Sequence, residues 1–76
     1  MTRSRLPSIT AREVVQKLRR AGYTMARQKG SHAILIRESD RRAVVVPMHV
    51  KRDLPKGTLH RIIQMAGLTV EKFSEL

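Results

Sequence analysis

The sequence predicts a small α+β domain in which one helix precedes three antiparallel strands and a second helix follows them. Two observations support this fold class: apolar residues recur at helical spacing near both ends of the chain, and short extended runs separated by turn residues lie between them. A chain of 76 residues makes one domain at most, here 1–76 with its core at about 9–73, and that core must be small.

The first helix is expected to begin at Thr10. Thr10 and Glu13 have the spacing of a capping box, in which each side chain accepts a hydrogen bond from the other residue's backbone N–H. Gly22 is expected to end the helix as a left-handed cap. Between these ends, the apolar residues that share one helical face are Ala11, Val14, Val15, Leu18 and Ala21.

The middle of the chain predicts a meander of three strands, in the stretches "YTMARQK", "SHAILIRE" and "RAVVVP". Gly30 and the turn "ESDR" separate them, and connections this short favour antiparallel pairing of neighbours. Pro47 can close the third strand because it has no N–H to give to a ladder. Strict alternation of side chains would place His32 on the same face as Ile34 and Ile36.

Asp53 with Pro55 marks the expected beginning of the second main helix, which Gly67 ends before Thr69 caps a last short turn. The predicted core face of this helix is Leu59, Ile62, Ile63 and Ala66. Two amphipathic helices and one sheet bury each other only if both helices pack on the same sheet face, which leaves the other face open to solvent. This arrangement is that of double-stranded-RNA-binding domains, an analogy of topology that does not establish function.

The charge indicates a polyanionic partner, since 16 Lys and Arg against 6 Asp and Glu give a net charge of +10. Nucleic acid, an anionic membrane and an acidic protein all fit such a charge. The cations run from Arg3 and Arg5 through the whole chain, whereas a membrane-surface helix would gather them on one amphipathic segment. Nucleic acid is therefore favoured. With only Tyr23 and Phe73 as aromatic residues, contacts to phosphate and 2'-hydroxyl groups should dominate over base stacking, although any single cation is equally well explained as solvated surface.

Other classes of partner and site are not expected. The sequence shows no secretory signal and no apolar run approaching the roughly 20 residues of a membrane span, which predicts a soluble cytoplasmic protein with no membrane partner. Cysteine is absent, and the histidines at 32, 49 and 60 form no paired motif with a carboxylate cluster. We therefore expect no metal site and no cofactor.

His32 is the foremost candidate for chemistry. It follows Gly30 at the start of a strand and is flanked by Lys29 and Ser31, so its imidazole could sit exposed beside a bound phosphate. Imidazole exchanges a proton near neutral pH, and in RNA the proton to remove is that of the 2'-hydroxyl, whose oxygen can then attack the neighbouring phosphorus. A lone histidine is more often structural than catalytic, so spacing alone leaves both interpretations open.

Two further stretches could contact phosphate. His49 lies in the basic connection after the third strand, where it could bind phosphate or act as a second proton carrier, whereas His60 should be an exposed helix residue. Gly57 near a helix start leaves free N–H groups that attract an anion, and Lys56 and Thr58 would strengthen that site. An ordinary helix start with a tolerated glycine explains the same stretch.

Five stretches between residues 9 and 73 together resemble one family: "LRRAGY", "RQKGSHAI", "VVVPMH", "LPKGTLHRII" and "AGLTVEKF". As an ordered set they look like the HicA-type toxins, small mRNA interferases of bacterial and archaeal toxin–antitoxin pairs. The resemblance implies a double-stranded-RNA-binding-like fold, an endoribonuclease whose catalytic histidine is His32, and a HicB-type antitoxin that covers the active site. The chain departs from many relatives in being wholly aliphatic at residues 33–36, where they carry an aromatic residue or a further histidine.

The predicted function is therefore a metal-independent endoribonuclease that cleaves single-stranded mRNA with His32 as general base. The residues expected to bind RNA are Lys29, Gly30, Ser31, His49, Lys56, Gly57 and Thr58. Two alternatives stay open. A non-catalytic RNA-binding domain could use the same basic surface and would not cut RNA, and a protein-interaction domain would show no salt-sensitive affinity for RNA.

Overall fold

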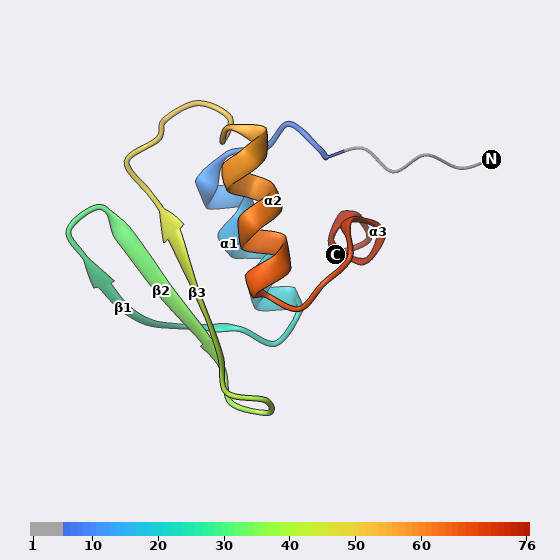
Figure 1. The fold of residues 1–76 in the computed structure, drawn as a ribbon. Helices are drawn as coiled ribbons and strands as arrows, with labels where there is room; N and C mark the ends of the chain where they lie inside the picture. Colours follow the sequence, from blue (N-terminus) through green and yellow to red (C-terminus); the bar gives the residue numbers. More distant parts are fainter. Residues whose placement is uncertain (1–5) are drawn as a thin grey trace.

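The computed structural model describes residues 6–76, so Arg3 and Arg5 lie outside the described residues. Along the chain the elements are α1 (Ala11–Arg20), β1 (Thr24–Lys29), β2 (His32–Arg37), β3 (Arg42–Pro47), α2 (Lys56–Met65) and α3 (Val70–Ser74) (Figure 1). The strands form one antiparallel sheet in the order β1-β2-β3. The predicted α+β class and the α-β-β-β-α order, as in double-stranded-RNA-binding domains, are confirmed.

Helix α1 has the predicted capping box. The backbone N–H of Thr10 donates to Glu13 Oε1 at 2.8 Å, and the N–H of Glu13 donates to Thr10 Oγ1 at 3.3 Å. Two hydrogen bonds from Thr10 lower the pKa of Glu13, because both favour the charged carboxylate. The bond from the backbone N–H has the larger effect, and the bond from the hydroxyl has the smaller. At the other end, Gly22 has a φ of +97° directly after the C-cap Ala21, as a left-handed cap requires.

The two faces of the sheet differ in burial. On one face, Leu35 pairs with Val44 and Ala33 pairs with Val46, and all four side chains are buried in the core with the helices. On the other face, Ile34 pairs with Val45, which is 39% exposed. In Figure 1 both main helices lie on the same side of the sheet. Alternation along β2 therefore places the exposed His32 on the open face, as predicted.

Helix α2 begins directly after Pro55, as predicted, and Asp53 takes no part in its cap. Pro55 is the N-cap, with an extended backbone and no side-chain cap bond. The approach to the helix is held instead by a tertiary contact, in which the N–H of Leu54 donates to the carbonyl of Ile9 at 2.9 Å. The predicted core face is confirmed, since Leu59, Ile62, Ile63 and Ala66 are all buried.

The short helix α3 near the end of the chain completes the hydrophobic core. Thr69 caps α3 by accepting a hydrogen bond from the N–H of Lys72 at 3.1 Å, and Phe73 is fully buried. Lys17 of α1 reaches this segment, with its Nζ 5.3 Å from the Phe73 ring centroid. None of the helices within residues 6–76 combines the length and apolar character needed to cross a membrane.

Candidate active site

A two-residue turn between β1 and β2 sets the position of His32. Lys29 and His32 face each other across the hairpin, so Gly30 and Ser31 alone connect the strands. Gly30 has a φ of +59°, whereas Ser31 is not left-handed, which is the pattern of a type II′ turn with glycine first. A Cβ at Gly30 would meet no atom within 4 Å, so the glycine is needed for its conformation and not for space.

His49 is brought to the same place by the segment that follows β3. Pro47 pairs with His32 at the end of the sheet. The N–H of Met48 then donates to the carbonyl of Ser31 at 2.6 Å, which holds the chain against the hairpin beyond the proline. The ring centroids of His32 and His49 are 5.9 Å apart, with the ring planes inclined by 58°. Both residues are exposed.

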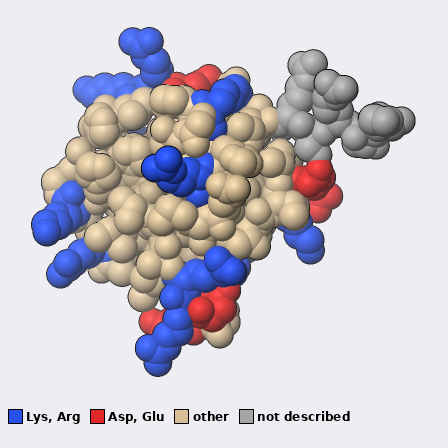
Figure 2. Space-filling view, viewed as in Figure 1, with Lys and Arg blue, Asp and Glu red and all other residues tan. Residues whose placement is uncertain are grey.

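Cations border the two imidazoles on the open face of the sheet. Lys29 lies opposite His32, and Arg27 lies opposite Ile34, and both cations are exposed. Within residues 6–76 all ion pairs involve Asp40, which is in the turn at the opposite end of β2 and β3. Lys29 and Arg27 are therefore available to an anionic ligand. Figure 2 shows Lys and Arg side chains spread over the visible face and not gathered in one patch.

Lys56, the first residue of α2, is engaged with the beginning of the described chain. Its Nζ donates hydrogen bonds of 3.0 Å to the carbonyls of Leu6 and Pro7 and to Ser8 Oγ. These acceptors carry no formal charge, so the positive charge of the ammonium is not neutralised. Its geometry differs from that of Lys29, whose side chain stands on the open sheet face.

Gly57 and Thr58 line a second place, at the start of α2. Together with Pro55 and Arg61 they border a shallow hollow of about 390 Å³. The loop at residues 48–55, which carries His49, leads from β3 to the beginning of α2. The structure brings Lys29, Ser31, His32 and His49 together, and none of these residues lines the hollow at the beginning of α2.

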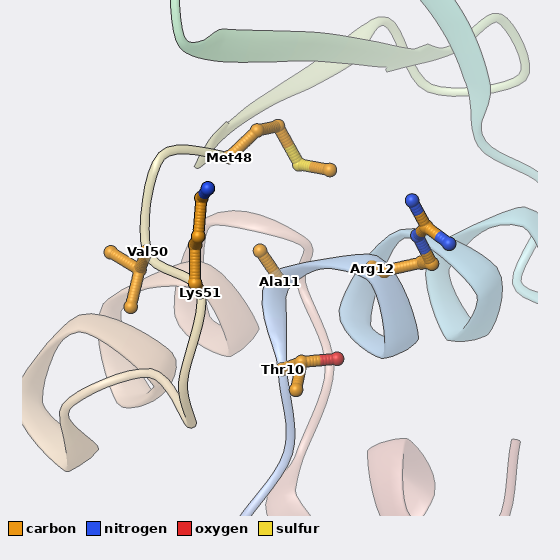
Figure 3. A pocket seen from close by; sticks show the side chains of 6 residues that line it. All are labelled: Thr10, Ala11, Arg12, Met48, Val50 and Lys51. Atoms are coloured by element: carbon orange, nitrogen blue, oxygen red, sulfur yellow. The ribbon is translucent and has the colours of Figure 1, made fainter.

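A further hollow of about 450 Å³ lies between the N-terminus of α1 and the loop after β3. Its lining is Thr10, Ala11, Arg12, Met48, Val50 and Lys51 (Figure 3). In Figure 3 the charged ends of Arg12 and Lys51 lie on either side of the hollow, toward Met48. Neither cation was singled out from sequence. The only local signal was that Lys51 follows His49 by two residues, since Arg12 approaches this loop only through the tertiary fold.

The site offers groups for proton transfer and for anion binding. Two exposed imidazoles can exchange protons with a ligand, and Lys29 can bind phosphate. Within the part of the chain that the structure describes, no group of three or more His, Cys, Asp and Glu side chains is placed to hold a metal ion.

Comparison with known proteins identifies one family. The family model described as the HicA toxin of bacterial toxin–antitoxin systems matches residues 11–68. This span covers α1, the whole sheet and α2, and therefore includes both histidines of the site. A search of curated proteins finds no significant match to the chain.

Proposed function

Since the chain belongs to the HicA family of toxins of toxin–antitoxin systems, we propose that it is an mRNA interferase, an endoribonuclease that cleaves single-stranded mRNA without a metal ion. The observation that carries the proposal is the exposed His32 at a glycine–serine turn, with Lys29 opposite it and the ring of His49 5.9 Å away. Such a site can remove a proton from a ligand whose negative charge is held by a neighbouring ammonium group.

In the proposed reaction His32 is the general base. It takes the proton of the 2'-hydroxyl, and the 2'-oxygen attacks the adjacent phosphorus. Lys29 stabilises the negative charge that develops on the phosphoryl oxygens, because a fixed positive charge near a reacting phosphate favours the transition state. Gly30 and Ser31 contribute by placing His32 and by letting the RNA backbone approach the turn.

The beginning of α2 is proposed as a second contact for the same RNA strand. Gly57 and Thr58 border a hollow at a helix N-terminus, where backbone N–H groups favour an anion, and Arg61 lies beside them. Lys56 adds its charge to this surface although its Nζ is hydrogen-bonded to carbonyls. A phosphate next to the scissile one would be held here, while Lys29 contacts the scissile phosphate itself.

The direct test is incubation of the purified protein with single-stranded RNA in EDTA. The wild type should cleave, and His32→Ala should bind RNA without cleaving it. His60→Ala is the matched control. His60 is also an exposed histidine, but it lies on α2, so this variant should cleave like the wild type. Binding without cleavage by the wild type would support a non-catalytic RNA-binding domain instead, and normal cleavage by His32→Ala would refute the assignment of the base.

We also propose that the partner is a HicB-type antitoxin with an acidic surface that covers His32. The motivation is the net charge of +10 together with exposed, unneutralised cations beside the histidines. Complementary charge accelerates association, and a partner that binds only the folded toxin stabilises it. Coexpression with a HicB-type protein encoded beside this chain should restore growth and raise the melting temperature of the toxin. If that protein neither binds nor relieves toxicity, the proposed partner is wrong.

A further inference from the structure

His49 lies beside His32 although the two residues come from different segments. Two contacts hold the segment before His49 against the turn that carries His32. Pro47 pairs with His32, and the N–H of Met48 donates to the carbonyl of Ser31 at 2.6 Å. On either side of His49, Met48 and Val50 are half-buried against the hydrophobic core. The backbone is thus held at both neighbours while the imidazole itself is exposed, as expected for a side chain directed to a ligand.

We propose that His49 is the general acid of the cleavage reaction, the residue that protonates the leaving oxygen. This inference rests on the proposed function, in which His32 is the general base. It deepens that function, because it makes the site a pair of proton-transfer groups with distinct roles. A single base would leave the departing oxygen as an unprotonated alkoxide, which is a poor leaving group.

A ring nitrogen of His32 takes the proton of the 2'-hydroxyl, and the 2'-oxygen forms a bond to phosphorus. The bond between phosphorus and the 5'-oxygen breaks, and its electron pair stays on that oxygen, which receives a proton from the imidazolium of His49. The products are a 2',3'-cyclic phosphate and a 5'-hydroxyl. His32 then releases its proton to water and His49 regains one from water, so no other reactant is required.

The arrangement of the two rings suits a general base at His32 and a general acid at His49. In such a displacement the attacking and leaving oxygens lie roughly in line on opposite sides of phosphorus, so base and acid must approach from two directions. The rings do not stack, since their planes are inclined by 58° and their centroids are 5.9 Å apart. Both residues are exposed, and the 5.9 Å between the ring centroids is short enough for one phosphate to contact both rings. In the reaction, one nitrogen of each ring would then have to come within hydrogen-bond distance of its oxygen, about 2.6–3.2 Å.

The test uses a leaving group that needs no proton. An RNA oligonucleotide in which sulfur replaces the bridging 5'-oxygen expels a thiolate, which is stable without protonation. On ordinary RNA, His49→Asn should cleave about a hundred- to ten-thousand-fold more slowly than the wild type, the usual effect of losing one acid–base group. On the sulfur substrate the same variant should be within a few-fold of the wild type. His32→Ala should be defective on both substrates, and His60→Ala on neither.

Each outcome decides between roles. If His49→Asn cleaves ordinary RNA at the wild-type rate, or if its defect is equally large on the sulfur substrate, His49 is not the general acid, and the second result would indicate a role in binding alone. Melting curves of the variants show whether they are folded, and the sulfur substrate is an internal control, because an unfolded variant would fail on both. If the wild type cleaves neither substrate, the proposed function itself fails and takes this inference with it.

Discussion

Both ends of the β2–β3 pair have basic side chains, but these are ion-paired at one end and without an ion pair among residues 6–76 at the other. At the turn between the strands, Arg37 Nη2 lies 2.7 Å from Asp40 Oδ2, and Arg42 Nε lies 3.2 Å from the same oxygen. Arg37 also donates to the carbonyl of Ala21 at 3.1 Å and lies 4.8 Å from the Tyr23 ring centroid. At the other end, the exposed His32 faces Lys29, and neither has an ion-pair partner among residues 6–76.

The charged side chains at the turn therefore stabilise the fold, whereas those at the histidine end are available to a ligand. The bonds of Arg37 connect the turn to the end of α1 and to the buried Tyr23, so its guanidinium is part of the structure. Cations without an ion pair at the histidine end add little to stability, and they can bind a phosphate without first breaking an ion pair. We therefore expect substitutions at the turn to change stability, and substitutions at the histidine end to change activity.

The largest effect is expected for His32→Asn at the histidine end. RNA cleavage should slow by about a hundred- to ten-thousand-fold, equivalent to about 3–5 kcal/mol of activation free energy. The free energy of unfolding should change by no more than about 0.5 kcal/mol, because the side chain is exposed. Cleavage kinetics and urea unfolding measured on one preparation check both halves. A variant that loses stability and activity in proportion would show that His32 is structural.

At the turn, Arg37→Met should lower the free energy of unfolding by about 1–3 kcal/mol. The change keeps the aliphatic stem but removes hydrogen bonds to Asp40 and Ala21 and the contact with the Tyr23 ring. Cleavage per folded molecule should be unchanged. Arg19→Met, on the exposed face of α1, is the control and should change stability by no more than about 0.5 kcal/mol. Equal destabilisation by both changes would show that the turn contacts contribute nothing specific.

The elements of this fold were predictable because their signals are local. The Thr10 and Glu13 capping box, the left-handed Gly22 and the alternation along β2 each depend on residues a few positions apart. The beginning of α2 was marked by Asp53 and Pro55, but the hydrogen bond from Leu54 to Ile9 was not predictable because it joins segments far apart in the chain.

In the candidate site, too, the locally determined features were predictable and those that depend on distant segments were not. The placement of His32 beside Lys29 follows from a two-residue turn, whose glycine is visible in the sequence. The 5.9 Å separation from His49 depends on the pairing of β3 with β2, and no spacing in the sequence gives it. The engagement of Lys56 by the carbonyl of Leu6 was likewise invisible, because it joins segments far apart in the chain.

The two ends should also differ in their contribution to RNA affinity, by a smaller amount. Lys29→Ala should reduce the slope of log affinity against log salt by about 0.7 for single-stranded RNA, the value for one lost phosphate contact. Arg42→Ala should leave the slope unchanged, because Arg42 is paired with Asp40 at the opposite end. Both changes are measured in the His32→Asn background so that the RNA stays intact. A reduced slope in both would mean that RNA runs along the full length of the sheet.

Acid should weaken the turn selectively, by the smallest effect in this series. The hydrogen bond from Arg37 is the main cause that lowers the pKa of Asp40 from 3.8 to about 2. A carboxylate whose pKa is lower in the folded than in the unfolded state stabilises the fold at any pH above its unfolded-state pKa. This stabilisation is lost as the pH falls through the folded-state pKa. The stability advantage of the wild type over Asp40→Asn should therefore be constant above about pH 4 and shrink toward pH 2. Glu38→Gln in the same turn is the control, and a pH-independent advantage would contradict the ion-pair account.

If the histidine end of the sheet cleaves RNA through the 2'-hydroxyl, the chemical ends of the products will show it. A single-stranded RNA is cut by the wild type in EDTA, the fragments are analysed by mass spectrometry, and the same oligonucleotide with deoxyribose at the cleaved nucleotide is treated in parallel. The account predicts 2',3'-cyclic phosphate and 5'-hydroxyl ends from RNA, and no cleavage of the deoxy-substituted strand. Fragments with 3'-hydroxyl and 5'-phosphate ends, or cleavage of the deoxy-substituted strand at the same position, would contradict it.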